Sequence, residues 1–327
     1  MASRSRSIKL LSLSAGKAAA GVVLACALLF EPPVPGLDQY ADAATLTRQP
    51  AAAAQAAAEG TTPPTAEKSV RFAVIGDTGT GDRPQYEVAA QLEKSRAIFP
   101  FEFVIMVGDN MYGSERPQDY VRKFELPYKP MLDAKVQFFA SLGNHDDPNQ
   151  RFYKPFNMNG ERYYTFKFGD PSVRFYALDS NYMTREQLEW IEKELANSDS
   201  PWKVAFFHHP LYSSGDRHGS EIDLREQLEP LFLKHGVNVV FAGHEHFYER
   251  VNPQKGIYYF TAGGSAKLRS GNIRKGALTA AGFDTDRSYM LVEVAGDVMH
   301  FQTISRLGRR VDSGSITRSN RATTQSP

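Results

Sequence analysis

The sequence contains a single cysteine, Cys26, among its 327 residues. One cysteine excludes an internal disulfide framework and any zinc site that depends on several thiolates. An excess of one charge sign is also missing, because 38 basic and 37 acidic residues leave a formal net charge of +1. Bulk charge therefore gives no reason to expect nucleic acid or an anionic membrane as a partner. The sequence has no repeat of fixed period, which argues against a solenoid or a propeller.

Long apolar runs are scarce, and the one that stands out lies near the N-terminus, at residues 18–30. Four basic residues precede it: Arg4, Arg6, Lys9 and Lys17. This order is typical of a secretory signal, and the run is short for a membrane span. Because Ala41-Asp42-Ala43 has the small-x-small form of a cleavage site, we expect residues 1–43 to be removed and the protein to be secreted or to lie in the periplasm or cell envelope. The alternatives are an uncleaved anchor, which would give the protein its membrane contact, and lipidation at Cys26.

The rest of the chain divides by composition. Residues 44–68 are rich in Ala, Thr, Pro and Gln and predict a flexible linker. Residues 69–316 alternate strand-like and helix-like segments and then continue as strands, which predicts one catalytic domain with an α/β core and antiparallel strands at its end. Residues 317–327 are polar and predict a disordered tail.

Within the catalytic domain, five apolar runs of strand length each end in a turn that carries polar donors. The runs span residues 70–75, 103–107, 136–142, 203–207 and 237–242. In open α/β sheets, ligands bind beyond the carboxyl ends of the strands, so all five turns are expected at one rim. The donors are Asp77, Asp109, Tyr112, Asn144, His208, His244 and His246. Seven donors exceed what one ion takes and suit two metals, with Asp109 as the bridge.

The types of donor indicate which metals the site could bind and which classes of hydrolase it does not resemble. In Gly243-His244-Glu245-His246 the two histidines alternate, so an extended backbone places both imidazoles on one side and Glu245 away from the metals. Imidazole and amide oxygen suit Zn, Fe(II) or Mn(II), whereas phenolate and carboxylate suit Fe(III). A serine hydrolase is disfavoured because no Gly-x-Ser-x-Gly is present. The glycine-rich turn 76–81 also lacks the Gly-Lys-Ser/Thr of a P-loop.

Each of these residues has a simpler interpretation. Asp77 could cap the following helix, and Asn144 could serve a turn. Tyr112 could be a packed aromatic residue. His209 could be structural rather than a contact to substrate, and His218 could be a solvated loop residue rather than part of the mouth of the site.

The motifs together resemble the calcineurin-like metallophosphoesterases over roughly residues 70–305, and Tyr112 points to the purple acid phosphatase branch, in its small bacterial-type or mammalian-like tartrate-resistant form. The motifs are Gly76-Asp77-x-Gly79, Gly108-Asp109-x-x-Tyr112, Gly143-Asn144-His145-Asp146, His208-x-Pro210 and Gly243-His244-x-His246. The resemblance implies an α/β fold of four layers, in which two mixed β-sheets pack face to face and are flanked by helices.

The resemblance also implies a role for each donor. It assigns Fe(III) to one set of ligands: Asp77, Asp109, Tyr112 and His246. It assigns Fe(II), Zn or Mn to a second set: Asp109, Asn144, His208 and His244. Both sets share Asp109, which would hold the two ions together.

The implied activity is that of an acid phosphatase, in which a metal-bound hydroxide attacks a phosphate monoester. His145 and Asp109 are the expected catalytic residues, and His145 would protonate the leaving alkoxide or hold the phosphate. The expected substrate contacts are Asn144, His145, His209 and His218. Phosphorylated small molecules or phosphoproteins are the expected partners.

Two other functions fit the same motifs. A phosphodiesterase or nucleotide hydrolase could use the same site, and residues outside the motifs would decide between them. A non-catalytic metal-binding surface protein is the other possibility; a missing ligand would indicate it, and none of the seven is missing.

Overall fold

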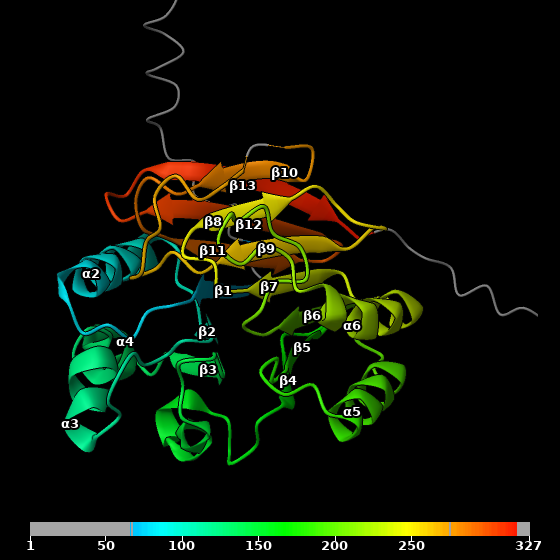
Figure 1. Ribbon diagram of the computed structural model, residues 1–327, viewed down its shortest axis with the longest axis horizontal. Helices are drawn as coiled ribbons and strands as arrows, with labels where there is room; N and C mark the ends of the chain where they lie inside the picture. The colour runs from blue at the N-terminus through cyan, green and yellow to red at the C-terminus, as the bar shows by residue number, and fades with distance from the viewer. Residues whose placement is uncertain (1–65, 67, 275, 319–327) are drawn as a thin grey trace, which may run out of the picture. The chain divides into compact units, whose positions relative to one another are not determined.

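The fold was obtained as a computed structural model, which describes Ala66 and residues 68–274 and 276–318. The predicted secretory signal, nearly all of the predicted linker and residues 319–327 lie outside the described residues. The described strands form two mixed sheets (Figure 1). Within the described part of the chain, no helix has the length and apolar composition needed to cross a bilayer.

The first sheet has six strands in the order β13-β12-β11-β1-β2-β3. They are β1 (Val70–Ile75), β2 (Phe103–Val107), β3 (Gln137–Ser141), β11 (Ser288–Ala295), β12 (Val298–Ser305) and β13 (Arg310–Thr317). β1, β2 and β3 run parallel, whereas β1 pairs with β11 in antiparallel fashion. The carboxyl ends of the three parallel strands therefore lie at one edge.

The second sheet has seven strands in the order β10-β8-β9-β7-β6-β5-β4. They are β4 (Tyr164–Phe168), β5 (Val173–Ala177), β6 (Trp202–Phe206), β7 (Val239–Ala242), β8 (Tyr248–Val251), β9 (Tyr258–Ala262) and β10 (Thr279–Phe283). Its centre, β5-β6-β7-β9, is parallel, and antiparallel strands close both sides.

Helices cover the outer faces of the two sheets. Figure 1 shows α2 (Arg83–Ile98), α3 (Pro117–Tyr120) and α4 (Lys129–Asp133) on one side, and α5 (Arg185–Ala196) and α6 (Ile222–His235) on the other. A π-helical turn (Val121–Glu125) lies between α3 and α4 in the chain. Two 3-10 turns (Pro148–Phe152 and Lys154–Phe156) follow β3. The layers are thus helix, sheet, sheet and helix.

Alternation along the strands creates three separate hydrophobic layers. In β2, Phe103, Ile105 and Val107 face the other sheet, whereas Val104 and Met106 face the helices. Rings from both sheets meet in the middle layer: Phe72 stacks on Phe103 at 5.2 Å and meets Phe175 edge-on at 5.3 Å between ring centroids. Strands buried on both faces need apolar residues at every position, which explains the unbroken apolar runs in the sequence.

The predicted fold class is confirmed, with three corrections in detail. The sequence analysis missed β8, β10 and β13, which are short or polar strands at or near the sheet edges. β13 ends at Thr317, so the predicted domain boundary at residue 316 falls inside a strand. The folded part also starts before Ser69, since the Ala66 backbone amide donates to Glu293 Oε1 at 3.0 Å.

Candidate metal centre

The carboxyl ends of the parallel strands from both sheets meet at one rim. The amide of Asp77, after β1, donates to Gly108 O at 3.1 Å, and the amide of Gly243, after β7, donates to His208 O at 2.8 Å. A Cβ at Gly243 would lie 2.6 Å from Val107 O and 2.7 Å from Asp77 Oδ2. The two sheets can approach this closely because position 243 has no side chain.

Three of the expected ligands adopt a backbone conformation that is uncommon for residues other than glycine. The φ angles of Asp77, Asp109 and His244 are 55°, 51° and 68°, in the left-handed region. Such strain persists where the surrounding structure enforces it, and it clusters at functional sites. The alternative role for Asp77 as a helix cap is excluded because Asp82 occupies the N-cap position of α2.

One group of donors, the carboxylate half, consists of Asp77, Asp109, Tyr112 and His246. The Tyr112 hydroxyl donates to Asp77 Oδ1 at 3.0 Å and lies 3.3 Å from His246 Nε2. His246 Nε2 is also 3.3 Å from Asp77 Oδ1. Ligand atoms of Asp77, Asp109 and His246 all lie within 4.8 Å of one another, close enough for one ion.

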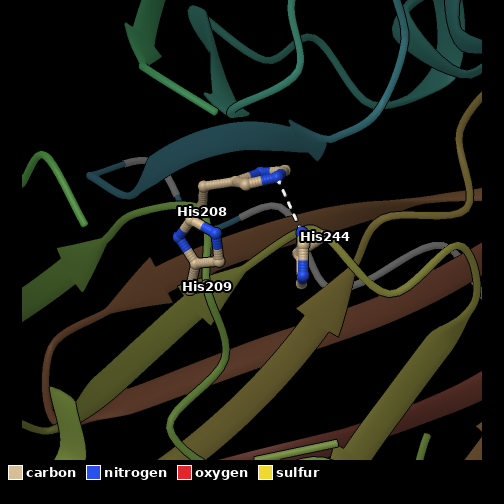
Figure 2. A group of neighbouring side chains, drawn as sticks. All are labelled: His208, His209 and His244. Atoms are coloured by element: carbon tan, nitrogen blue, oxygen red, sulfur yellow. Dashed lines mark hydrogen bonds between the residues drawn. The ribbon is translucent and has the colours of Figure 1, made fainter. Parts of the chain in front are cut away.

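The second group, the imidazole half, consists of Asn144, His208 and His244. His208 Nδ1 lies 3.0 Å from the carbonyl oxygen of Val107, so Nδ1 carries the proton and Nε2 has a free lone pair. That Nε2 atom is 3.0 Å from Asn144 Oδ1 and 3.2 Å from His244 Nδ1, which is itself 3.0 Å from Asn144 Oδ1. Figure 2 shows the contact between the His208 and His244 rings. Two acceptors, His208 Nε2 and Asn144 Oδ1, and a nitrogen of His244 gather here around one point, which is the arrangement of a cation site.

Asp109 lies between the two halves. Its Oδ1 atom is 3.3 Å from His208 Nε2 in the imidazole half, and a carboxylate oxygen groups with Asp77 and His246 in the carboxylate half. The backbone amide of His145 donates to the same Oδ1 at 3.0 Å. This is the position that a bridging carboxylate requires.

Burial shifts the protonation of both halves toward neutral side chains. Burial, with the nearby Asp109 carboxylate, raises the pKa of Asp77 well above its usual range, and burial raises the pKa of Tyr112. Burial lowers the pKa of His246 to about 4, and burial with the neighbouring His208 lowers that of His244 to about 2. The imidazoles are therefore ready as neutral ligands, and cations would stabilise the carboxylate and phenolate forms.

The donors present fit a pair of metal ions. Carboxylates and a phenol in one half are hard anionic donors, whereas two imidazoles and an amide oxygen in the other are neutral donors. The ammonium group of Lys267 lies 4.4 Å from the centroid of the Tyr112 ring, where its charge favours negative charge on the phenol. All seven expected donors thus gather at the rim, and their individual roles as ligands remain predictions.

Two exposed histidines flank the centre on opposite sides. The His145 ring lies beside the carboxylate half, 4.9 Å from the Tyr112 ring between centroids. The His218 ring lies beside the imidazole half, 4.2 Å from the His244 ring. Both imidazoles are exposed to solvent at the mouth of the site, as a role in substrate contact requires.

His209 lies deeper than a contact to substrate alone would require. Its ligand atoms group with those of His208 and His244 within 4.8 Å, and Figure 2 shows the three rings together. Its Nδ1 atom meets the Ser180 hydroxyl at 2.9 Å, which leaves Nε2 as its free nitrogen. Burial lowers the pKa of His209 to about 4, so it is a neutral imidazole that could reach either metal or substrate.

Two carboxylates hold the site in place: Asp146, for which the sequence predicted no role, and Glu245, which was expected to point away from the metals and could orient its neighbours. The carboxylate of Asp146, in the third motif, accepts bonds from the amides of Gly143, Asn110 and Met111 at 2.7, 3.1 and 2.9 Å. These hydrogen bonds hold the turn after β3 against the turn after β2. The position of Asp146 directly after Asn144 and His145, two expected site residues, was the available signal.

The second of these carboxylates is Glu245, which points away from the metals as expected and fixes the loop that carries His218. Its Oε1 atom accepts from the amides of His218 and Gly219 at 3.1 and 2.8 Å. Arg269 lies 3.4 Å from its Oε2 atom. A Cβ at Gly215 would lie 2.0 Å from Oε1, so the loop packs directly on this carboxylate.

Comparison with known proteins points to one family. The family model for calcineurin-like phosphoesterases matches residues 70–248, more than half of the chain. Purple acid phosphatase 17 of Arabidopsis thaliana is 26% identical over 289 residues, which cover 73% of this chain and 85% of that protein. Tartrate-resistant acid phosphatase type 5 of Oryctolagus cuniculus is 24% identical over 248 residues, which cover 63% of this chain and 74% of that protein.

A solved structure agrees with the fold. The purple acid phosphatase PPD1 from yellow lupin (Lupinus luteus) superposes with a TM-score of 0.65 at 21% sequence identity. The match covers 77% of this chain and 54% of that chain. At this identity the likeness supports the architecture of two sheets flanked by helices.

Proposed function

Because this chain belongs to the calcineurin-like phosphoesterase family, we propose that it is an acid phosphatase that hydrolyses phosphate monoesters at a two-metal centre. Its likeness to purple and tartrate-resistant acid phosphatases supports phosphoester hydrolysis as the class of reaction. The preference for monoesters is the finer part of the proposal.

The observation that carries the proposal is a pair of facing acceptors in the imidazole half. His208 Nε2 lies 3.0 Å from Asn144 Oδ1, although the proton of His208 is on its other nitrogen, and His244 Nδ1 lies within 3.2 Å of both atoms. Lone pairs held this close repel one another unless a cation lies among them. The carboxylate half adds a second such point, joined to the first through Asp109.

The residues around the centre have different roles in the proposed hydrolysis. Two ions bound there would neutralise the charge of the phosphate and acidify a water molecule. Asp109 keeps the two halves in a fixed relative position. The backbone amide of His145 donates a hydrogen bond to the Asp109 carboxylate at 3.0 Å. The His145 ring is free to hold a phosphate oxygen or to pass a proton to the leaving oxygen. His218, on the other side, is placed to hold a second phosphate oxygen.

The two halves differ in the ions that they favour. We assign Fe(III) to the carboxylate half, since carboxylates and phenolate are hard anionic donors. We assign Fe(II), Zn or Mn to the imidazole half, whose donors are neutral.

The test combines metal analysis with a pair of substrates. We expect about two metals per chain and faster hydrolysis of p-nitrophenyl phosphate than of bis(p-nitrophenyl) phosphate. His244→Ala should lose both metal and activity, whereas His300→Ala, which changes a histidine on β12 away from the rim, should retain both. A single metal with full activity, or a preference for the diester, would contradict the proposal.

The cellular setting is a separate proposal that rests on the N-terminal sequence. We infer that the chain acts outside the cytoplasm, on phosphorylated small molecules or phosphoproteins, because a basic stretch precedes the apolar run 18–30. Sequencing the N-terminus of the exported protein should give a start near residue 44. A chain that stays in the cytoplasm would contradict this inference.

A further inference from the structure

A cavity of about 430 Å³ opens beside the imidazole half of the metal centre. Asn144 and His209, which lie at the imidazole half, line this cavity together with Arg162 and Tyr182. Ser180 and Asn181, which follow β5, also line it. A phosphate held at the metals would thus have its ester oxygen next to a space of defined size.

The charges of this cavity disfavour an anionic group. The Arg162 guanidinium is already paired, because its Nη2 atom lies 2.5 Å from Oδ2 of the buried Asp179. Two further carboxylates, Asp146 and Glu221, belong to the lining. A second phosphate on the substrate would meet a neutralised cation and two acids, so the cavity suits a neutral group.

What the cavity does offer is an aromatic surface. The side chain of Tyr182 is 61% exposed, and the Arg162 guanidinium lies 4.8 Å from the centroid of its ring. The guanidinium orients the ring and leaves most of its surface open. An exposed aromatic side chain in the lining of a cavity is the usual element for binding a planar ligand.

We propose that this cavity is the leaving-group subsite of the enzyme and that Tyr182 stacks on a planar aromatic ring of the substrate. Two sources share this chemistry: the base of a nucleoside monophosphate and the phenyl ring of an aryl phosphate. The proposal deepens the proposed function and rests on it, because a leaving group is defined by cleavage of a monoester. It makes Tyr182 a residue that determines specificity.

The test uses two substrates that differ in the aromatic ring alone. Adenosine 5′-monophosphate and ribose 5-phosphate share their ester linkage, but ribose 5-phosphate lacks the base. Stacking of a base on a protein aromatic ring corresponds to roughly 5- to 100-fold in binding. Tyr182→Ala should lower kcat/KM for adenosine monophosphate by that factor and change ribose 5-phosphate less than about twofold. Tyr182→Phe keeps the ring and should retain both rates.

A third substrate separates the two sources of the ring. If Tyr182→Ala lowers kcat/KM for O-phosphotyrosine and leaves adenosine monophosphate unchanged, the subsite takes aryl phosphates. If adenosine monophosphate is the affected substrate, the subsite takes nucleosides. Unchanged kcat/KM for both, or an equal loss on adenosine monophosphate and ribose 5-phosphate, would overturn the proposal.

Phe152 provides a matched control. It is also 61% exposed and also carries a guanidinium on its ring, with Arg151 at 4.5 Å, but it does not line the cavity. Phe152→Ala should leave all three substrates unchanged. If the wild-type protein cleaves no monoester, the proposed function fails. The dissociation constants of adenosine monophosphate and ribose 5-phosphate then give the same comparison. Tighter binding of adenosine monophosphate that is lost in Tyr182→Ala would support the subsite. Equal binding of the two ligands by the wild-type protein would contradict it.

Discussion

The two halves of the metal centre differ in charge and in exposure. The carboxylate half is built on Asp77 and Asp109, which are 0% and 1% exposed, and it adds a phenol. The imidazole half has neutral donors; its His208 is fully buried, whereas its Asn144 is exposed at the edge of the cavity. Buried anionic donors are stable only beside a high positive charge, whereas neutral donors need less compensation.

This difference suggests a division of roles. The anionic carboxylate half would keep its ion, and the neutral imidazole half, which lies beside the cavity, would exchange its ion and receive the substrate. The comparison predicts that variants in the two halves, and in the residues between them, differ in how they change activity, metal content and stability.

The largest effect is expected where the halves join. Asp109→Asn should lower kcat by on the order of 100- to 1000-fold, because an amide cannot bridge two cations as a carboxylate does. Steady-state kinetics on p-nitrophenyl phosphate would measure this effect, with KM changing less than kcat. A drop of less than about tenfold would argue against a bridge.

A smaller and selective effect is expected at the histidine beside the carboxylate half. His145→Ala should keep the metals and slow alkyl phosphates by roughly 100-fold or more, because a poor leaving group needs a proton. Nitrophenyl phosphate should suffer less. His218→Ala, beside the imidazole half, is the matched variant and should slow both esters alike. If His145→Ala also slows both alike, His145 positions phosphate instead.

The next effect concerns the loop beside the imidazole half. Glu245→Gln removes the charge that holds the amides of His218 and Gly219, so activity should fall by roughly 10-fold, as is common for residues that support a metal site. Hydrogen exchange of residues 213–220 should increase while the metal content stays at the wild-type level. Unchanged exchange with reduced activity would point instead to a direct role of the carboxylate at the metals.

The smallest effect is on the stability of the metal-free protein, and the buried histidines and Asp77 should change it in opposite directions as the pH changes. Burial lowers the pKa of His246 and His209 to about 4, so the unfolded chain binds protons that the folded chain does not, and stability falls as pH drops from about 6.5 toward 4. Burial raises the pKa of Asp77, so the folded chain holds the extra proton and stability falls as pH rises above about 3.8.

Urea unfolding of chelated protein at several pH values would separate the two contributions. Each group contributes at most about 1.4 kcal/mol per pH unit. Asp77→Asn should reduce the loss at rising pH, of which Asp146 keeps a part because burial also raises its pKa, and should retain the loss at acid pH. A variant that loses both dependences would show that the histidines and Asp77 do not titrate separately.

Most of the centre could be predicted from the sequence because its donors follow shortly after the ends of predicted strands. An apolar run such as 103–107 fixes a buried strand, and the glycine and aspartate that follow it mark where the chain leaves the sheet. Parallel packing then brings such ends together, which is why Asp77, Asp109 and His244 were found together.

The parts that could not be predicted depend on contacts between segments far apart in the sequence. Glu245 meets the loop around His218 through tertiary packing, and no local pattern shows that contact. The cavity beside His209 is formed by Arg162 and Tyr182, which belong to no motif. β13 was missed because an edge strand has few apolar residues.

The central claim is that the two halves hold two unlike metals, and one measurement tests it directly. The absorption spectrum and the metal content of the iron-loaded protein are compared with those of Tyr112→Phe. A phenolate bound to ferric iron, as the family resemblance implies, gives a violet band. We predict about two metals per chain and a band that disappears in Tyr112→Phe. An iron-replete protein whose spectrum is the same before and after the substitution would contradict the account.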